Sequence, residues 1–394
     1  MLAVLLAATA AQGPGPATLT LADALERARG ARGRAAQAAA GVAEARARER
    51  LAGQVPNPLV AYDHSGDTPH QHLVVEQPLA WLATRGADRG AARALLRRAR
   101  ADSTLLLAEV DREVRVAFFG ALGAAESLRL VTEQVGLSDS LARIAGRRLQ
   151  AGDISRLEYD QAAQEARRGQ QLVSAARENA RSADLSFARA IGWAGTAPPA
   201  PRGALDAELD DAFAPAPPAD SLPLVRAAAA DSAAARLELR SARLGRLPIP
   251  SLSGGAEWSD PDRPGKTLSV LGFALPLPFW NAGGAQAALA SARAERAAAE
   301  TREVRLSAER AVAEARVHLE ETARRARFAR DSLAPAARDL RARAVAAYRA
   351  GETGVLPVLD ALRGERDVVL AGVQDLIAFQ EAVAEWRALL GRPE

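Results

Sequence analysis

The chain has 394 residues, of which 48% are hydrophobic but only 4% aromatic, so its apolar content is mostly Ala, Leu and Val. Charged residues make up 25% of the chain, yet the formal net charge is only +3 and no basic run is interleaved with aromatic side chains, which argues against a nucleic-acid partner. There is no cysteine, so disulfides, thiolate metal sites and a cysteine nucleophile are excluded. No nucleophile motif, phosphate loop or cluster of His and carboxylates occurs either, and we expect neither an enzyme nor a cofactor.

The N-terminus carries an apolar run that ends near Ala8-Thr9-Ala10, a pattern typical of a signal-peptide cleavage site. A Gly/Pro stretch over residues 13–16 separates this run from the rest of the chain. The sequence therefore predicts a signal peptide over residues 1–11, with a buried N-terminal helix as the alternative. No later segment has the roughly 18 consecutive apolar residues that a transmembrane helix requires.

A first repeat is predicted over residues 18–193. It begins with a helix at about 20–54, which ends at a pair of prolines that cannot continue it. Two extended segments come next, with a β-hairpin at about 58–80. They lead into a very long helix at about 90–150, because the apolar residues there recur at steps of three and four. After a break at Gly152, a return helix completes the repeat.

A second repeat is predicted over residues 220–394, after a Pro/Ala-rich connector at 194–219. It shows the same order of elements, with a β-hairpin at about 250–278. The spacing between Gly152 and Gly351 equals the spacing between Gly192 and Gly391. This constant offset indicates a duplication of about half the chain rather than a short solenoid repeat.

The extended segments of the second repeat alternate in polarity. Leu252, Gly254, Ala256 and Trp258 alternate with serines, glycine and glutamate, which is typical of strands whose two faces meet different environments. Each hairpin offers about ten residues a strand, enough to cross a bilayer as part of a barrel. Four strands cannot close a barrel, and open sheet edges are not tolerated in lipid. If the strands cross a membrane, the protein must therefore oligomerise.

The duplicated order of elements, the stretch "GFALPLPFWNAGGAQAALASARAE" and the stretch "YRAGETGVLPVLDA" together resemble the TolC family of outer-membrane efflux channels. Within the first stretch, the sequence Pro-Leu-Pro-Phe-Trp-Asn is most similar to the sequences of the heavy-metal efflux branch. The resemblance implies a mainly α protein with a small membrane β part, whose homotrimer forms a twelve-stranded barrel in the outer membrane and a long periplasmic helical tunnel.

The same resemblance implies passive export of metal ions, drugs or other small molecules. These would be delivered by an inner-membrane pump of the RND or a similar type and by a periplasmic adaptor protein. A periplasmic coiled-coil adaptor or a structural scaffold is the alternative, although an adaptor would carry a lipoyl-like β domain in place of two hairpin repeats. Outer-membrane lipid would surround the strands, and no cofactor is implied.

The breaks at the ends of the long helices match the tip motif of the family. Glycine suits these turns because the chain reverses there, often at positive φ. By resemblance, the adaptor would contact Arg148, Leu149, Gly152 and Ser155 in the first repeat, and Tyr348, Gly351, Gly354 and Leu356 in the second.

Asp360 occupies the second of the two positions at which some family members carry pore-narrowing aspartates, but Pro357 occupies the first. The resemblance thus implies one ring of three Asp360 side chains as the pore gate, which would attract cations. A solvated helix carboxylate is the alternative.

Gly136 and Pro335 precede the two tip glycines by the same distance, and both weaken a helix. We interpret them as a paired hinge, with chance weak points as the alternative.

Aromatic side chains lie where the strands join the helices, at Trp81, Phe279 and Trp280. They fit a membrane-interface girdle, and packing at the junction is the alternative.

His64, His70 and His72 fall in the first hairpin, where His70 and His72 would share one strand face. No carboxylate lies at a clear ligand spacing, so we predict polar positions in a loop or a lumen and no metal site. His318 is expected to be solvated.

Overall fold

The computed structural model describes residues 18–31, 33–195 and 197–392. The predicted signal peptide at 1–11 lies outside the described residues. In the described part, no helix is both long and apolar enough to span a bilayer.

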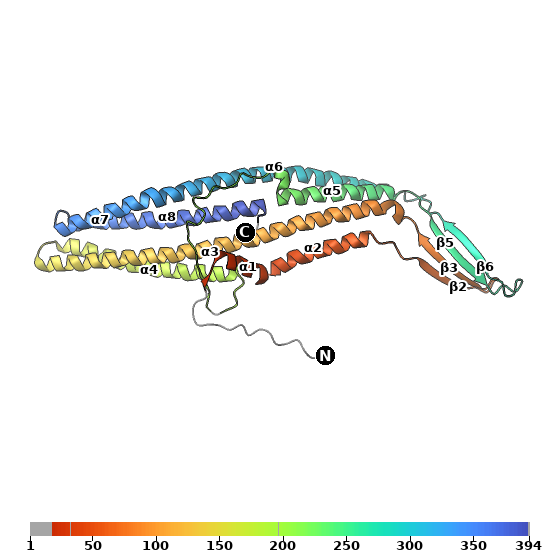
Figure 1. Cartoon of the computed structure of the whole chain (residues 1–394), viewed down its shortest axis with the longest axis horizontal. Helices are drawn as coiled ribbons and strands as arrows, with labels where there is room; N and C mark the ends of the chain where they lie inside the picture. Colours follow the sequence, from red (N-terminus) through yellow and green to blue (C-terminus); the bar gives the residue numbers. More distant parts are fainter. Residues whose placement is uncertain (1–17, 32, 196, 393–394) are drawn as a thin grey trace, which may run out of the picture. The chain divides into compact units, whose positions relative to one another are not determined.

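The first half of the chain follows the predicted order of elements (Figure 1). The long helix begins earlier than the predicted residue 90, at Trp81, with two residues between it and the proline that ends the second strand. It tolerates Gly90 because the side chain of Leu237 packs against that position, where an added Cβ would lie 3.2 Å from Leu237 Cδ1. The elements are β1 (Thr18–Leu19), α1 (Leu21–Ala31), α2 (Gly33–Ala52), β2 (Leu59–His64), β3 (Gln71–Pro78), α3 (Trp81–Ala151) and α4 (Arg156–Ala190).

The second half repeats this order, with a single helix, α5, in the place of α1 and α2. Its long helix is interrupted by a single π-helical turn, Ala329–Leu333, which directly precedes the segment that contains Pro335. The elements are β4 (Ala200–Pro201) in the connector, then α5 (Pro223–Leu244), β5 (Ser251–Trp258), β6 (Leu268–Ala274), α6 (Gly284–Phe328), α7 (Ala334–Ala350) and α8 (Val355–Leu390).

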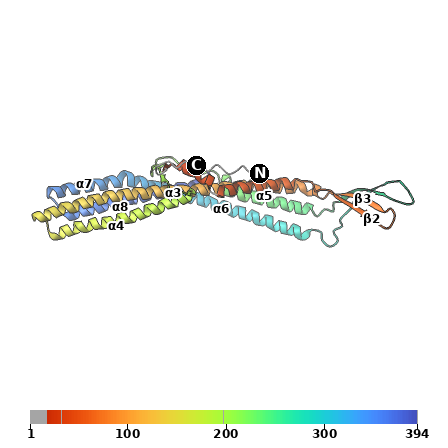
Figure 2. The same cartoon turned by 90° about the horizontal axis from the view of Figure 1, so that it is seen from below.

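The chain divides into two compact units, and each draws on both repeats. The first unit contains α1, Leu107–Pro215 and the chain from Val312 onward. Within it, the tip-ward half of α3 runs alongside α4, and α7 runs alongside α8, in both ribbon views (Figures 1 and 2). The second unit contains Ala36–Leu106 and Ala216–Ala311, and therefore holds the four long strands.

The core of the first unit is an aromatic cluster between α1, α3 and α4. Phe118 is fully buried and meets Phe119 and Phe187 edge-on, with ring centroids 5.3 and 5.6 Å apart. Edge-to-face pairs of this kind add to the stabilisation from apolar burial. The parallel pairing of β1 with β4 ties the start of the first repeat to the connector beside this cluster.

The connector is folded against the helices of the first unit. Arg115, which is only 1% exposed, donates to Glu208 at 3.0 Å and to the side-chain oxygen of Gln380 at 2.6 Å. Gln380 in turn donates to the backbone oxygens of Leu205 and Ala207. Composition alone predicts a Pro/Ala-rich linker, whereas buried polar side chains of α3 and α8 hold this segment in place.

The sheet of the second unit has the strand order β2–β3–β5–β6, and every neighbouring pair is antiparallel. The two hairpins are therefore joined through β3 and β5. The helices of this unit are linked by polar contacts, such as the hydrogen bond from Ser241 Oγ to Asp88 Oδ1 and the ion pair between Arg93 and Glu49.

Candidate functional site

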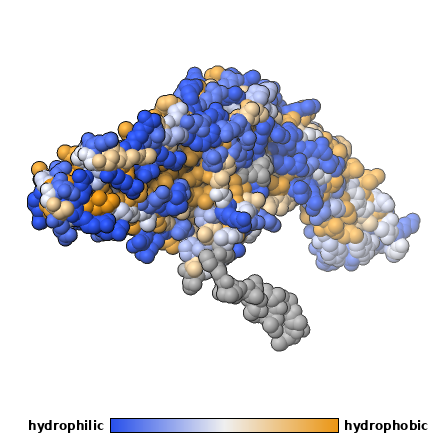
Figure 3. Space-filling view, turned by 60° about the vertical axis from the view of Figure 1, so that its left-hand side comes forward, coloured by the Kyte–Doolittle hydropathy of each residue, from blue (hydrophilic) through white to orange (hydrophobic). Residues whose placement is uncertain are grey.

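The register of the sheet separates an apolar face from a polar face. Residues opposite one another on neighbouring strands share a face, and the face alternates along each strand. Most side chains of the apolar face are exposed, with Leu271 at 87%, and Figure 3 shows apolar colour gathered over the strands. This face carries Val60, Tyr62, Leu73, Val75, Leu252, Ala256, Leu271 and Phe273, whereas the other carries Asp63, His72, Glu76, Ser251, Ser253 and Glu257.

The alternation read from the second hairpin is therefore confirmed, and the first hairpin shows it too. The described strands leave two sheet edges, β2 and β6, with no further strand bound to them. Such a sheet exposes both a large apolar surface and two rows of unpaired backbone groups.

The aromatic residues at the strand–helix junctions differ in their surroundings. Trp280 is 97% exposed and Phe279 is also exposed, and their rings meet edge-on with centroids 6.0 Å apart. Trp81 is half-buried at the start of α3, and the guanidinium of Arg85 lies 5.2 Å from its ring centroid. Trp81 thus contributes to packing at the junction, while the membrane-interface role of all three stays a prediction.

The histidines of the first hairpin do not form one group of three: the ring centroids of His64 and His70 lie 6.3 Å apart, whereas His72 has a different partner. His70 precedes β3, and its Nδ1 lies 3.3 Å from the backbone oxygen of Ser65, so the expectation that it shares a strand face with His72 is wrong. His72 Nδ1 instead lies 3.2 Å from Glu257 Oε1 of the second repeat. Sequence reasoning missed this carboxylate because the pairing of β3 with β5 leaves no local pattern. In the described part of the chain, no cluster of His and acidic residues is arranged to hold a metal ion. His318 is exposed.

The two helix tips have the same backbone geometry, as the repeated glycines predict. Gly152 and Gly351 both have φ of 81°. The N–H of Gly152 donates to Leu149 O at 3.0 Å, and the N–H of Gly351 donates to Tyr348 O at 3.2 Å. A left-handed residue at this position satisfies carbonyls at a helix end and is most accessible to glycine.

The helices that leave the tips are capped differently. Ser155 and Glu158 form a capping box at the start of α4, with Glu158 N–H donating to Ser155 Oγ at 3.3 Å and Ser155 N–H donating to Glu158 Oε2 at 2.9 Å. Gly354, at the start of α8, has no side chain to do this. The spacing Ser-x-x-Glu is a readable signal for the first cap, although Glu158 is not among the predicted tip residues.

Glu158 also contacts the second tip. Its carboxylate accepts the N–H of Val355, the first residue of α8, and a Cβ added to Gly354 would lie 3.3 Å from Glu158 Oε1. The pKa of Glu158 is lowered, chiefly by the backbone and hydroxyl hydrogen bonds from Ser155, with smaller contributions from Val355 N–H and the charge of Arg148. One carboxylate thus serves the starts of two helices.

Arg148 joins the two tips from the other side. Its guanidinium lies 5.0 Å from the ring centroid of Tyr348, and its Nη1 donates to Tyr348 O at 3.3 Å. Tyr348 is only 2% exposed, within a cluster that includes Leu141, Val355 and Leu359. Among the predicted contact residues, Tyr348 is therefore interior to the chain, Arg148 and Leu149 are half-buried, and the remaining five lie at the surface: Gly152, Ser155, Gly351, Gly354 and Leu356.

Asp360 lies on the first turns of α8 with its side chain 73% exposed, 3.5 Å from Arg363 Nη1. Arg363 and Arg366 both bind Glu165 of α4, which is only 3% exposed. Arg363 is thus shared between an exposed and a buried carboxylate.

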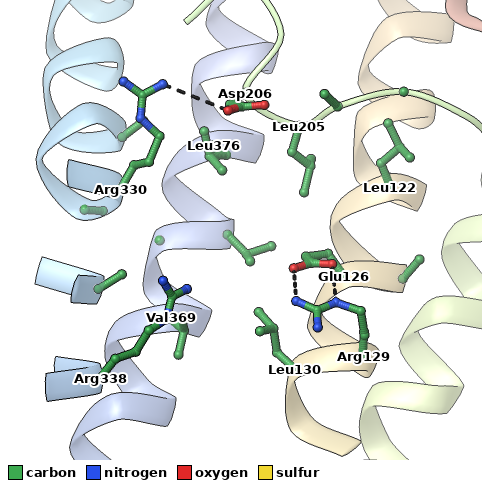
Figure 4. A pocket seen from close by; sticks show the side chains of 18 residues that line it. Leu122, Glu126, Arg129, Leu130, Leu205, Asp206, Arg330, Arg338, Val369 and Leu376 are labelled. Atoms are coloured by element: carbon green, nitrogen blue, oxygen red, sulfur yellow. Dashed lines mark hydrogen bonds and ion pairs between the residues drawn. The ribbon is translucent and has the colours of Figure 1, made fainter. Parts of the chain in front are cut away.

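The two predicted hinge positions differ. Gly136 lies inside the uninterrupted helix α3, with open space around its Cα. Pro335 lies just after the π-turn, where Arg330 donates to both carboxylate oxygens of Asp210 at 2.9 and 3.0 Å. The π-turn also borders a cavity of about 600 Å3 between α3, the connector and α8 (Figure 4).

Comparisons with known proteins give a family match over the second repeat and a shared fold over nearly the whole chain. Residues 220–392 match the family model described as outer membrane efflux protein. Among solved structures, CusC is 18% identical with a TM-score of 0.78, over 95% of this chain and 92% of that one. A membrane protein from Pseudomonas aeruginosa is 21% identical with a TM-score of 0.78, over 94% and 92%. The open-state MtrE outer membrane channel of Neisseria gonorrhoeae is 16% identical with a TM-score of 0.76, over 94% and 89%. No protein with a curated description matches the sequence.

The duplicated helical plan and the two-faced four-stranded sheet are those of a protomer of a TolC-type outer-membrane channel. The second repeat carries the match to the outer membrane efflux protein family, and the whole chain shares the fold of these channels. These matches confirm the predicted fold class, and they favour the predicted outer-membrane efflux channel over the alternative of an adaptor or scaffold.

Proposed function

We propose that three copies of this chain close a twelve-stranded barrel and form the outer-membrane tunnel of a tripartite efflux system. The observation that carries the proposal is the sheet β2–β3–β5–β6, which has an exposed apolar face and two open edges. In lipid, unpaired backbone groups cost several kcal/mol each, so the edges of one copy must pair with those of the next. Four strands a chain give twelve in a trimer, consistent with the even strand numbers of outer-membrane barrels.

The helical tips are the proposed contact with a periplasmic adaptor protein. The glycine turns, with Ser155 and Leu356, present surface to such a partner, whereas Tyr348 acts from inside by supporting Arg148. Metal ions, drugs or other small molecules would reach the channel from an inner-membrane pump of the RND or a similar type. Export through the channel itself would be passive.

Two further roles belong to this proposal. A ring of three Asp360 side chains would narrow the pore, because each is exposed and near the tip. The hinge would lie chiefly at the π-turn and Pro335, since π-turns and prolines are recognised causes of helix distortion and Gly136 leaves α3 regular.

Fractionation of cells that express the full chain tests the assembly. We expect a heat-resistant trimer in the outer-membrane fraction and stepwise conductance when the purified trimer is added to a planar lipid bilayer. A soluble monomer, or a membrane trimer without conductance, would overturn the proposal.

Cross-linking tests the adaptor contact. Because the chain has no cysteine, a label attached to a single-cysteine variant reacts at that position alone. A photoreactive label at Leu356→Cys should capture a co-expressed periplasmic adaptor protein. The matched control is Val317→Cys, which is also exposed but lies on α6. Equal capture at both positions would contradict a tip contact.

For the pore gate, Asp360→Ala should raise conductance and lower the preference for cations. Asp367→Ala removes a similarly exposed carboxylate from the same helix and serves as the control. Unchanged conductance and cation preference in Asp360→Ala would rule out the ring.

A further inference from the structure

We propose that residues 205–210 of the connector act as a clasp, which holds the π-turn of the second long helix to α3 and α8 and must release the π-turn when the channel opens. This inference rests on the proposed function, in which the π-turn is the hinge of the channel. It assigns a gating role to a segment whose composition predicts only a linker.

One side of the clasp is anchored in the protein interior. The carboxylate of Glu208 accepts from Arg115 of α3 at 3.0 Å and from Arg387 of α8 at 2.7 Å, and Arg115 is fully buried. Gln380 of α8 donates to two backbone oxygens of the clasp, at 3.0 and 2.7 Å. Breaking a buried ion pair by removing one partner is strongly destabilising, so this side stays attached.

Glu208 is also held in a strained backbone conformation. Its φ is 64°, in the left-handed region that a residue with a Cβ rarely occupies and that a glycine adopts without strain. Such strain persists only where the surrounding contacts impose the conformation. The contacts of the Glu208 carboxylate with two helices therefore outweigh the backbone strain at this position.

The other side of the clasp reaches the π-turn through exposed contacts. Arg330, within the π-turn, donates to both carboxylate oxygens of Asp210 at 2.9 and 3.0 Å, and its Nη1 lies 4.0 Å from Asp206 Oδ2 (Figure 4). Arg327, at the end of α6, donates to the backbone oxygen of Leu209 at 3.0 Å. The side chain of Asp210 is 66% exposed, and exposed ion pairs are weak. This is therefore the side that releases.

Helix packing is incomplete where the clasp crosses the helices. A cavity of about 600 Å3 lies between α3, the clasp, the π-turn and α8, and Leu122, Leu205 and Leu376 are among the side chains around it (Figure 4). Close-packed side chains would resist a shift of one helix against another, but they do not fill this space. The polar contacts of the clasp therefore supply the connection, and their release leaves room for the π-turn to move.

Single-channel recordings of the full-length trimer in a planar bilayer measure the ratio of open to closed time. Asp206→Asn/Asp210→Asn weakens the hold on Arg330, and we expect the ratio to rise about fivefold. In the wild type the ratio should also rise between about 0.1 M and 1 M KCl, because salt screens exposed charges, and it should rise much less in this variant. Asp206→Glu/Asp210→Glu keeps both charges and should keep the ratio close to that of the wild type.

Two controls separate the clasp from a general change in charge or folding. Asp211→Asn removes the adjacent exposed carboxylate, which in the described part of the chain is not an ion-pair partner of Arg330, and should leave the ratio unchanged. Glu208→Gly removes the buried anchor while relieving the backbone strain, and should raise the ratio. If Glu208→Gly does not assemble, the exposed-side variant decides. Because the clasp restrains a bend that Pro335 permits, Pro335→Ala should lower the ratio instead.

The inference is wrong if Asp206→Asn/Asp210→Asn opens no more often than the wild type, or if Asp211→Asn raises the ratio as much. It is also wrong if this double variant and the wild type respond equally to salt. A variant that only unfolds at a lower temperature, with an unchanged ratio, would show that the contacts are purely structural and would overturn the clasp too. A wild-type chain that forms no channel would instead refute the proposed function, so the two failures are distinguishable.

Discussion

Two pairs of helices meet at the tips, α3 with α4 and α7 with α8. They share the same arrangement but differ in the continuity of the long helix and in how the return helix is capped. In the first pair, α3 runs without interruption for 71 residues, and α4 begins with its own capping box. In the second pair, the long helix is broken by the π-turn before Pro335, and α8 begins at Gly354 without a capping side chain. The tip glycines between the helices nevertheless have identical φ angles.

This difference means that the second pair depends on the first. Glu158 of α4 supplies the cap that α8 lacks, Arg148 of α3 donates to the backbone of Tyr348, and Glu165 of α4 holds Arg363 and Arg366 of α8. The reverse contributions are fewer, since α4 needs nothing from α8 for its own cap. If one pair moves outward when the channel opens, we expect it to be the second, and these three contacts to break.

The largest expected effect is at Glu165, which is almost fully buried and binds two arginines. Replacement by alanine would remove the buried partner of Arg363 and Arg366, which would keep only the exposed carboxylates of Asp360 and Asp367, at a cost of about 3 kcal/mol. Backbone hydrogen exchange of α4 and α8 should accelerate, and thermal unfolding of the purified trimer should occur at a lower temperature. The control Glu178→Ala removes an exposed carboxylate from the same helix and should change neither quantity.

The contribution of Glu165 also depends on pH. Burial alone would raise its pKa, but the hydrogen bonds and charges of Arg363 and Arg366 outweigh burial and lower it. A carboxyl whose folded pKa is depressed stabilises the protein above its unfolded pKa, and this stabilisation is lost as pH falls through the folded pKa. Wild type should therefore lose stability at acid pH more steeply than Glu165→Ala; parallel pH profiles would contradict the role assigned to this carboxylate.

Because the two tip glycines have the same φ angle, replacing either one should lower stability by the same amount. Gly351→Ala and Gly152→Ala should each cost about 1–2 kcal/mol, because an L-residue is strained at a φ of 81° and no neighbouring atom adds a clash. Gly136→Ala is the control, since it lies in regular helix with open space and should stabilise by about 1 kcal/mol. Local hydrogen exchange at each turn measures the change. A tolerated alanine at one tip only would show that the turns are not equivalent.

Removing the contact of Glu158 with the start of α8 should change stability less than the variants above, and only in the first turns of α4 and α8. Glu158→Ala should destabilise the first turns of both α4 and α8 by about 1 kcal/mol, whereas Ser155→Ala should loosen chiefly α4. The folded pKa of Glu158 is lowered, so its contribution is present above the unfolded pKa and is lost as pH falls through the folded value. Protection of the Val355 amide, relative to its intrinsic exchange rate at each pH, should therefore fall in acid in the wild type. Equal effects of both variants on α8 would refute the shared cap.

The sequence predicts the order of elements, both hairpins and both tip glycines, because these features depend on local periodicity and on backbone conformations that glycine favours. It does not predict the pairing of His72 with Glu257, the cap that Glu158 gives to α8, or the ion pair between Arg115 and Glu208. Each of these joins residues that are far apart in the chain, and no local pattern marks such partners. Pro335 is a visible helix breaker, but the form of the break, a π-turn, depends on packing against the connector.

The smallest expected change in stability is at Pro335, and it bears most directly on the difference between the two long helices. Proline inside a regular helix costs about 3 kcal/mol, but the preceding π-turn already accommodates it, so Pro335→Ala should gain less than about 1 kcal/mol. If alanine lets the π-turn revert to regular helix, the register on one side changes by one residue, which rotates side chains by about 100°. Arg330 would then lose its two hydrogen bonds to Asp210. Hydrogen exchange over residues 329–335 should slow, and opening measured by conductance should decrease, more than in Gly136→Ala. If Gly136→Ala combined with Pro335→Ala leaves conductance and export untouched, neither position is a hinge, and the broken helix would be a packing adjustment to the connector alone.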